Sequence, residues 1–446
     1  MTGTKVAFVG AGSMVFARNL VGDVLSYPEL EDSEIALMDI DEHRLDRTAT
    51  IAEAMVAEND VGATVTATTD RREALTGADY VIVTINVGGT EPFESEIRIP
   101  ERYGVEQAIG DTLGPGGVFR GLRTMPDVLE IVRDMEEVCP GALMLNYTNP
   151  MGILTWAIGE ATDVDVVGLC HSVPHTASAI ADYVGVPADE LEYWVAGINH
   201  MAWFLECTHD GESVYPALRA AMEDPETYER DTVRFEMLRH FDAFVTESSH
   251  HVSEYVPYFR TDEGTIEAMS GEGFAGRMET AAYLKGWKER SAERDAGDVD
   301  IEEHDLSIER SEEYGARVIH AIEADDRERL NLNLPRNDGL IANLGDDACV
   351  EVPCLVDGTG VHPCQVGELP PQLAALDRSA VAVQRLAVEA GRTGDRDRLK
   401  RAIKLDPLTA ATCTLDEIDE MVDEILTANS DYLPMFDAPA ATATDD

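Results

Sequence analysis

Short apolar runs alternate with longer amphipathic segments in the N-terminal half of the chain. The runs 4–10 (TKVAFVG), 34–40 (EIALMDI) and 78–87 (ADYVIVTINV) are rich in β-branched residues, and segments with helical periodicity such as 14–27 separate them. Strands that alternate with helices predict βαβ units and a parallel sheet. We therefore expect an α/β fold with a Rossmann-type, doubly wound parallel sheet, and we assign residues 1–195 to this domain.

The pattern changes after this region. Residues 191–211 predict two strands that turn at Gly197 to His200, residues 337–363 predict a second strand pair, and most of the remainder has helical periodicity. We expect a C-terminal α+β domain over residues 196–436 that carries catalysis and dimerisation. The last segment, 437–446 (DAPAATATDD), is predicted to be a disordered acidic tail.

One long segment between two predicted elements, residues 90–122, is rich in glycine. We expect a loop here, followed by a helix over 125–138. Long ordered loops inside compact domains are usually functional. This segment contains Asp111 and Arg120 among glycines that permit close approach to a ligand, although a simple connecting loop is an alternative.

Composition narrows the class of protein. The chain has 446 residues, of which 44% are hydrophobic and 27% charged, as is typical of a soluble globular protein. No apolar run reaches the roughly 18 residues of a membrane helix, and the first strand begins too early for a signal peptide. Seven cysteines without a CxxC pair fit a reducing compartment. We expect a cytoplasmic protein without a membrane partner.

The net charge of −52 is extreme. Nucleic acid is therefore an unsuitable partner, because phosphate binding needs basic residues. Charge on this scale destabilises a compact protein by self-repulsion at low salt, a lever that halophiles use. The acidic residues are spread along the whole chain. We therefore predict that the protein comes from a halophile.

The first strand ends in a glycine-rich turn, GAGSMVF, that leads into a helix. Such a turn allows a pyrophosphate to reach the free N–H groups of the helix start, although the third glycine of the usual pattern is missing. Asp39 ends the next strand and can accept a ribose 2′-hydroxyl, which favours NAD over NADP; alternatively it caps the following helix. Asn86 ends a strand at the same sheet edge. The predicted NAD-binding residues are Gly10, Gly12, Ser13, Met14, Asp39 and Asn86.

Further polar side chains come directly after other predicted strands. The run 166–173 (VVGLCHSV) stops on Cys170 and His171, which can ligate a metal or move a proton. The strand before it ends on Asn149, which can hold sugar hydroxyls or form a turn before proline. His200 can supply a second ligand from another strand end. Carboxyl ends of parallel strands collect ligands, but a buried free cysteine and a core histidine are the alternatives.

A set of motifs in a fixed order extends this interpretation. They are VGAGS (9–13), INVGG (85–89), GDTLGPGGVFRGLRTMP (110–126), NYTNPMG (146–152), GLCHS (168–172), AGINH (196–200) and TESSHHVSEYVPYFR (246–260). With them, the chain from Lys5 to about Pro434 resembles the NAD-dependent glycosidases of glycoside hydrolase family 4, which do not use the common two-carboxylate mechanism. The resemblance implies a fold related to lactate and malate dehydrogenases.

The resemblance also implies cofactors and chemistry. A divalent metal, typically Mn²⁺, is held by a cysteine and a histidine, which match Cys170 and His200. NAD⁺ oxidises carbon 3 of the sugar, a tyrosine removes the proton on carbon 2, the aglycone leaves carbon 1, water adds, and the hydride returns. The metal acts as a Lewis acid on the enolate. Family members are homodimers or homotetramers.

Individual roles are implied by the same resemblance. The tyrosine base is Tyr255 or Tyr258, with a slight preference for Tyr255. Asp111 matches an acidic residue near the metal, and Asn149 matches a substrate contact. Where phospho-sugar members carry an aspartate as general acid, this chain has His171. That departure makes His171, or alternatively His175, the candidate acid.

The substrate prediction depends on the residues after the strand 78–87. Phospho-glucosidases of the family place arginines there to hold a 6-phosphate, whereas this chain has EPFESEI, which would repel it. We therefore predict an α-galactosidase type enzyme for unphosphorylated glycosides. Alternatives are an α-glucosidase or an α-glucuronidase or α-galacturonidase, with Arg120 or Arg260 as partner of a sugar carboxylate. Other classes are an NAD-dependent hydroxy-acid or polyol dehydrogenase and a nucleotide-sensing protein.

Overall fold

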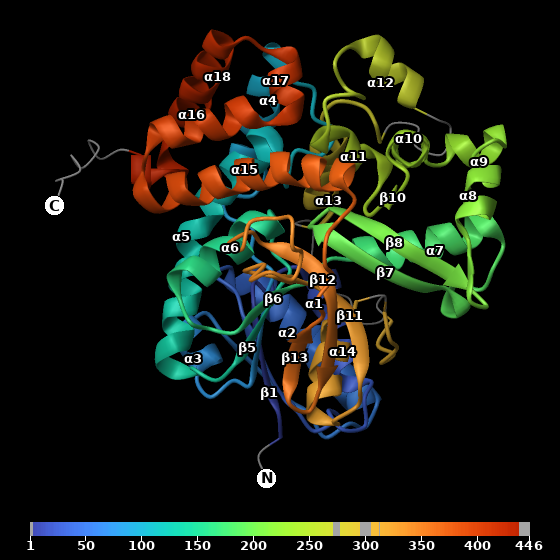
Figure 1. Ribbon diagram of the computed structural model, residues 1–446. Coiled ribbons are helices and arrows are strands. Elements are labelled where there is room, and N and C mark those ends of the chain that lie inside the picture. Colours follow the sequence, from blue (N-terminus) through green and yellow to red (C-terminus); the bar gives the residue numbers. More distant parts are fainter. Residues whose placement is uncertain (1–2, 271–276, 295–304, 312, 437–446) are drawn as a thin grey trace.

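The structure is a computed structural model that describes residues 3–270, 277–294, 305–311 and 313–436 (Figure 1). The predicted acidic tail, 437–446, lies outside the described residues. Within the described part of the chain, no helix is both long and apolar enough to cross a lipid bilayer.

Parallel strands form the N-terminal half of one large sheet, in the spatial order β3-β2-β1-β4-β5-β6. This is the strand order of dinucleotide-binding domains, in which the order reverses between the first and fourth strands. The predicted doubly wound sheet is therefore confirmed. The strands are β1 (Lys5–Val9), β2 (Glu34–Met38), β3 (Thr64–Thr68), β4 (Tyr80–Val83), β5 (Leu143–Asn146) and β6 (Val166–Gly168).

Helices accompany these strands along the chain. β1 and β4–β6 are almost wholly buried because their Val, Ile, Leu and Met side chains are covered on both faces. The helices are α1 (Met14–Leu25), α2 (Glu42–Glu58), α3 (Arg71–Leu75), α4 (Thr90–Arg102), α5 (Gly114–Val138), α6 (Met151–Ala161) and α7 (Ser172–Val184).

The sheet continues beyond β6 with antiparallel strands, in the order β6-β11-β12-β7-β8-β10. The predicted turn at Gly197 to His200 is confirmed, since β7 and β8 form a hairpin there. The strands are β7 (Glu192–Ile198), β8 (Met201–His209), β9 (Glu212–Ser213), β10 (Phe244–Val245), β11 (Glu328–Leu334), β12 (Val350–Asp357) and β13 (Gly360–Pro363).

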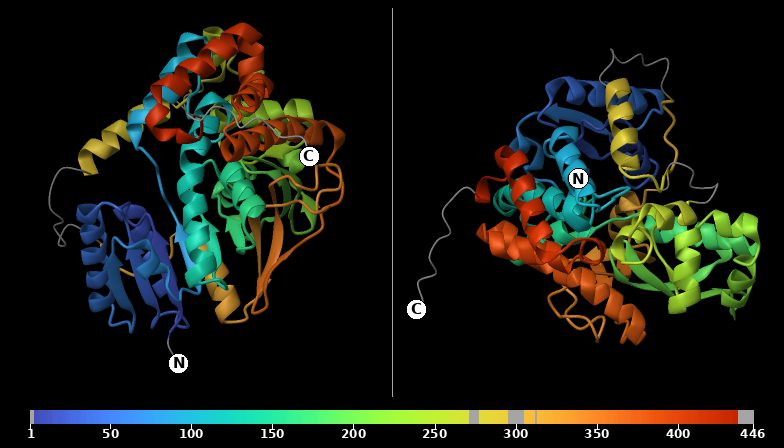
Figure 2. Two further views of the ribbon diagram at one scale, coloured as in Figure 1. Left: turned by 90° about the vertical axis from the view of Figure 1, so that its left-hand side faces the viewer. Right: turned by 90° about the horizontal axis from the view of Figure 1, so that it is seen from above.

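Helices make up most of the remaining chain. α15–α18 gather with α4 at the end of the molecule opposite the N-terminus (Figures 1 and 2). The helices are α8 (Tyr215–Ala221), α9 (Pro225–Glu229), α10 (Thr232–Phe241), α11 (Ser249–Tyr255), α12 (Glu263–Met269), α13 (Ala282–Arg294), α14 (Gly315–Glu323), α15 (Pro371–Thr393), α16 (Arg396–Leu405), α17 (Pro407–Thr412) and α18 (Leu415–Ala428). One apolar core runs from β1 to α18, across the predicted domain boundary at 195.

One expectation for local structure was wrong and a second was right only in part. Residues 90–122 are not one long loop, because α4 and the first turns of α5 occupy most of them. The glycines there serve packing: a Cβ on Gly117 would lie 2.3 Å from the backbone of Thr112. In the segment 337–363, β12 pairs with β13 and β11, while residues 337–346 contribute only an isolated bridge at Ile341.

Candidate active site

The predicted dinucleotide residues lie at the edge where β1 and β4 end. Gly10 has φ +94°, and a Cβ there would lie 2.8 Å from the backbone of Thr84, so only glycine fits. The N–H of Gly12 donates a hydrogen bond to Oδ2 of Asp39 (2.7 Å). This is the point at which the strand order reverses, where open α/β sheets bind ligands.

The other predicted NAD-binding residues lie at the same edge of the sheet. Ser13 is the N-cap of α1, and Met14 is its first residue, although the side chain of Met14 is not described. Asn86 is exposed just beyond the end of β4. Asp39 does not cap α2, because the side chain of Asp41 accepts the hydrogen bond from the N–H of Arg44. The carboxylate of Asp39 therefore remains beside the glycine-rich turn.

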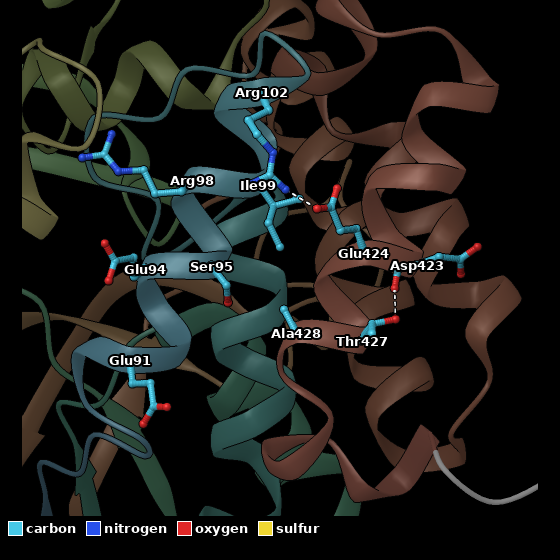
Figure 3. Close-up of a pocket in the computed structure, with 10 residues that line it drawn as sticks. All are labelled: Glu91, Glu94, Ser95, Arg98, Ile99, Arg102, Asp423, Glu424, Thr427 and Ala428. Carbon is cyan, nitrogen blue, oxygen red and sulfur yellow. Dashed lines mark hydrogen bonds and ion pairs between the residues drawn. The ribbon is translucent and has the colours of Figure 1, made fainter.

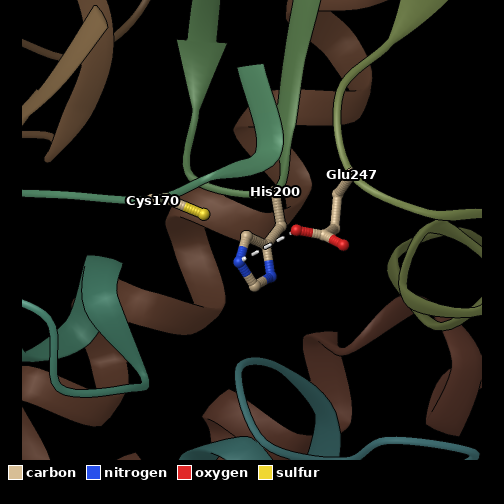
Figure 4. Close-up of side chains that lie close together, drawn as sticks. All are labelled: Cys170, His200 and Glu247. Carbon is tan, nitrogen blue, oxygen red and sulfur yellow. Dashed lines mark ion pairs between the residues drawn. The ribbon is translucent and has the colours of Figure 1, made fainter. Parts of the chain in front are cut away.

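The two predicted metal ligands come together with a third side chain, Glu247 (Figure 4). Ligand atoms of Cys170, His200 and Glu247 all lie within 4.8 Å of one another. Cys170 follows β6, His200 occupies the β7–β8 turn, and Glu247 follows β10. His200 and Glu247 have φ of +65° and +66°, a conformation that costs about 1–2 kcal/mol for residues other than glycine and that often marks functional sites.

Electrostatics at this cluster suit a divalent cation. Burial raises the pKa of the Cys170 thiol to about 11, and the carboxylate of Glu247 adds to the shift. Burial lowers the pKa of His200, which favours the neutral imidazole. Nδ1 of His200 has no hydrogen-bond partner among the described residues. One thiol that a metal can deprotonate, one neutral imidazole and one carboxylate are a fitting donor set.

His251 connects this cluster to Asp111. Its Nδ1 lies 3.2 Å from Oε1 of Glu247, and its Nε2 lies 3.6 Å from Oδ1 of Asp111. Burial opposes a charge on His251, but Glu247 and Asp111 raise its pKa well above the usual range. Burial likewise opposes ionisation of Asp111, yet His251 and Arg120 lower its pKa to about 2. The result is a row of alternating charges, in which Asp111 and Arg120 are buried and Glu247 and His251 are partly buried.

Two predicted substrate-binding residues also contact Asp111. Nδ2 of Asn149 donates to Oδ2 of Asp111 (3.2 Å), and Nη1 of Arg120 lies 3.7 Å from the same oxygen. The guanidinium of Arg120 also lies over the rings of Phe93 (5.8 Å) and Trp287 (5.6 Å). The structure thus places Asp111, Asn149 and Arg120 beside the candidate metal ligands.

The two candidate tyrosines differ in position. Tyr255, on α11, is 2% exposed, and its ring centroid lies 6.4 Å from that of His200. Burial raises its pKa well above 10, and a hydrogen bond with Thr112 opposes the shift. Tyr258 is 48% exposed and stacks on Phe241. Of the two, the structure brings Tyr255 to the cluster.

Comparison with known proteins settles the family. A model described as "Family 4 glycosyl hydrolase" matches residues 5–186, and one described as "Family 4 glycosyl hydrolase C-terminal domain" matches residues 195–409. The chain belongs to glycosyl hydrolase family 4. The family predicted from the motifs is therefore confirmed.

Individual relatives of this family 4 glycosyl hydrolase match over nearly its whole length. It is 40% identical to an alpha-galactosidase of Rhizobium meliloti (strain 1021), covering 98% of this chain and 90% of that protein. It is also 40% identical to an alpha-galactosidase of Bacillus subtilis (strain 168), covering 97% and 99%. The 6-phospho-beta glucosidase of Thermotoga maritima, solved with manganese, NAD⁺ and glucose-6-phosphate, has the same fold, with a TM-score of 0.78 at 23% identity over 96% and 99% of the chains.

Arg260 lies apart from the cluster in this family 4 glycosyl hydrolase. It is fully buried, and its guanidinium donates hydrogen bonds to the backbone carbonyls of Glu106 and Met278. On the same segment, the carboxylate of Glu254 accepts hydrogen bonds from the N–H groups of Ile109 and Gly110. Both side chains therefore hold the loop that carries Asp111, and Arg260 is not placed to contact a sugar carboxylate.

The candidate acid, His171, lies next to Cys170 in sequence but pairs elsewhere. Its Nε2 is 2.5 Å from Oε2 of Glu313, just before α14, and its ring stacks on that of His175 (5.4 Å between centroids). Cys170 itself is held by Tyr314, whose hydroxyl accepts from the N–H of Cys170 (2.9 Å).

A large surface groove lies elsewhere, between α4 and α18 (Figure 3). It has a volume of about 740 Å³ and is open, with the ion pair between Arg102 and Glu424 across it. None of the predicted site residues lines it. The chemistry of the strand ends, rather than the size of this groove, marks the candidate active site.

Sequence reasoning missed Glu247 and His251 as members of the site. Both lie in the motif that runs from Thr246 to Arg260, so the signal was present. What the sequence does not reveal is the backbone conformation at Glu247 and the short α11, which together turn both side chains toward Cys170 and Asp111.

Proposed function

We propose that this family 4 glycosyl hydrolase is an α-galactosidase that cleaves unphosphorylated α-galactosides. Two alpha-galactosidases that are 40% identical along nearly the whole chain support this activity. The observation that carries the mechanism is the convergence of Cys170, His200 and Glu247 beside Tyr255, at the edge where the parallel strands end.

The cofactors have separate places in this proposal. The pyrophosphate of NAD would lie at the start of α1, against Gly10, Gly12, Ser13 and Met14. Asp39 would accept hydrogen bonds from the ribose hydroxyls, and Asn86 would lie beside the sugar part of NAD. Cys170, His200 and Glu247 would hold Mn²⁺ or a similar divalent metal. When bound, NAD supplies reversible oxidation at carbon 3 of the sugar, and the metal supplies Lewis-acid polarisation of the ketone formed there.

The side chains around the cluster perform the proton transfers and the positioning. Tyr255 would take the proton from carbon 2, since its hydroxyl is buried near His200 and a neighbouring cation lowers the pKa of a phenol. Asn149 and Asp111 would orient sugar hydroxyls through their amide and carboxylate groups. His171, paired with Glu313, would protonate the leaving group.

Acidic residues after β4 support an unphosphorylated substrate. Glu91 and Glu94 stand on the first turns of α4, directly after Gly88 and Gly89. They stand where phospho-glucosidases of the family carry arginines that hold a 6-phosphate, although in this structure both side chains line the groove between α4 and α18. A uronide is a second candidate, since the buried guanidinium of Arg120 lies beside Asp111 and could pair with a sugar carboxylate.

A panel of p-nitrophenyl glycosides tests the activity. With NAD⁺, Mn²⁺ and a reductant in molar KCl, we expect release of nitrophenol from the α-galactoside above all others. Preference for an α-glucoside or a uronide would overturn the substrate assignment, and release from none of them would overturn the hydrolase assignment in favour of a dehydrogenase.

Isotope exchange tests the proposed route. With a galactoside deuterated at carbon 2, the product is expected to lose the label to solvent, because Tyr255 removes that proton. Complete retention of the label during turnover would exclude elimination.

We further propose that the protein works inside a halophile cell as a homodimer or homotetramer. The net charge of −52 supports high salt, and seven free cysteines support a reducing compartment. The family resemblance supports the oligomer.

A further inference from the structure

One buried carboxyl group close to the candidate metal cluster is not used in the proposed mechanism. Glu351, on β12, is completely buried. Neither Oε1 nor Oε2 has a hydrogen-bond partner within the described residues. A buried carboxyl group without partners destabilises the folded state, so its presence at this position needs a compensating interaction.

The register of the sheet places Glu351 in one row with residues that closely precede two of the metal ligands. Glu351 pairs with Gly197 on β7 and with Asn333 on β11, and Asn333 pairs with Gly168 on β6. Cys170 lies two residues beyond Gly168, and His200 three residues beyond Gly197.

His200, one of the candidate metal ligands, has a hydrogen-bond donor that also lacks a partner. Nε2 of His200 is 3.6 Å from Glu247 and so faces the cluster, whereas Nδ1 is buried without a hydrogen-bond partner in the described part of the chain. Burial raises the pKa of Glu351, Cys170 and Glu247 raise it further, and His200 lowers it, so all three candidate ligands lie within electrostatic range of this carboxyl group. Two unpartnered groups of complementary type therefore lie close together.

We propose that Glu351 is the positioning residue of the metal site, accepting the Nδ1–H of His200 through one water molecule, since neither group has a direct partner within the described residues. Histidines that ligate a metal commonly donate their other N–H to a carboxylate, which fixes the ring and its tautomer and makes the ligating nitrogen more basic. Here the hydrogen bond keeps Nε2 of His200 toward Cys170 and Glu247. This inference rests on the metal site of the proposed function.

The test is metal binding, measured without turnover. The variant Glu351→Gln keeps the shape of the side chain and removes its charge. We expect the Kd for Mn²⁺, measured by calorimetry, to rise by about 10- to 100-fold, as is typical when such an outer partner is lost. With Co²⁺ as probe, we expect the visible absorption bands to shift, because the geometry at His200 changes.

A matched control is available in the same region. Asp377, on α15, is also fully buried, and its Oδ2 lies 3.1 Å from the position that a Cβ on Gly197 would take. Unlike Glu351, Asp377 has a partner, because its Oδ1 accepts a hydrogen bond from Nε1 of Trp203. Asp377→Asn should bind Mn²⁺ and Co²⁺ as the unaltered protein does. An equal loss in both variants, or an unchanged Kd and spectrum in Glu351→Gln, would overturn the proposal.

Two further measurements keep the outcomes separate. Circular dichroism and NAD binding show whether the variant folds. If Glu351→Gln does not fold, Glu351→Asp retracts the carboxylate by one methylene and should still weaken Mn²⁺ binding. An unchanged Kd for Mn²⁺ in Glu351→Asp counts against the proposal. Absence of Mn²⁺ binding in the unaltered protein would refute the metal site of the proposed function itself, whereas unaltered binding in the variants refutes only the role of Glu351.

Discussion

The N–H of Gly12 donates a 2.7 Å hydrogen bond to Oδ2 of Asp39, which joins the turn after β1 to the end of β2. The same carboxylate receives the N–H of Asp41 on Oδ1 (2.9 Å). Both oxygens are thereby held in place beside the start of α1, with lone pairs left for the hydroxyls of a ribose.

Replacement of this carboxylate is expected to weaken NAD binding. For Asp39→Asn we predict a rise of about tenfold in the Kd for NAD, since a hydrogen bond to a charged group contributes about 1.5–3 kcal/mol, and a smaller preference over NADP. Calorimetric titration measures both. Asp41→Asn, which keeps the cap of α2, is the control, and equal affinities for all three proteins would contradict the role of Asp39.

Loss of the Cys170 thiol is expected to affect the metal and not the binding of NAD. Cys170→Ser should remove metal-dependent activity and the thermal stabilisation by Mn²⁺, while NAD binding stays measurable, because the β1 edge is unchanged. Cys207→Ala, in a separate core cluster, should retain metal dependence. Full activity of Cys170→Ser would remove Cys170 from the metal site.

The two tyrosines provide a paired experiment. Tyr255→Phe is expected to lower kcat by about 10²-fold or more, the usual scale for loss of a general base, and to abolish exchange of the carbon-2 proton. Tyr258→Phe should leave kcat within about twofold, because that side chain is half exposed and lies on Phe241. The reverse result would assign the base to Tyr258.

The buried carboxyl group of Asp406 is expected to make the free energy of unfolding depend on pH. Burial raises its pKa to about 6, although Thr409 opposes the shift. The folded state thus binds more protons than the unfolded state between about pH 4 and 6, and this contribution to stability is lost as pH rises through 6.

The variant Asp406→Asn removes this titration and retains an acceptor for the N–H of Thr409. Relative to the unaltered protein, it should therefore gain about 2–3 kcal/mol between pH 4 and 8. Urea unfolding at several pH values measures the difference. A difference in unfolding free energy that does not change with pH would contradict the raised pKa.

Salt should stabilise the whole protein. With a net charge of −52, we expect Tm to rise as KCl increases from low to molar concentration, because screening reduces repulsion between carboxylates. Thermal unfolding monitored by circular dichroism measures this, with sucrose as an uncharged control. A Tm indifferent to KCl would argue against adaptation to high salt.

Much of the site could be predicted from the sequence because it lies at strand ends. Apolar β-branched runs identify buried parallel strands, and the carboxyl ends of such strands meet at one edge. Gly12, Asp39, Asn149 and Cys170 each come shortly after a strand, so the sequence alone predicts that they lie at one edge of the sheet. The order of the motifs then identified the family.

Only the tertiary structure decided the remainder. Residues 90–122 became helical because glycines let the start of α5 pack against the backbone at Thr112, a contact that local pattern does not contain. Arg260 turned inward to backbone carbonyls, and Tyr258 outward to Phe241. The approach of Glu247 and Glu351 to His200 depends on strand register and backbone dihedral angles, which long-range pairing sets. The sequence determined which chemistry is present, and the pairing of distant strands determined which side chains share the site.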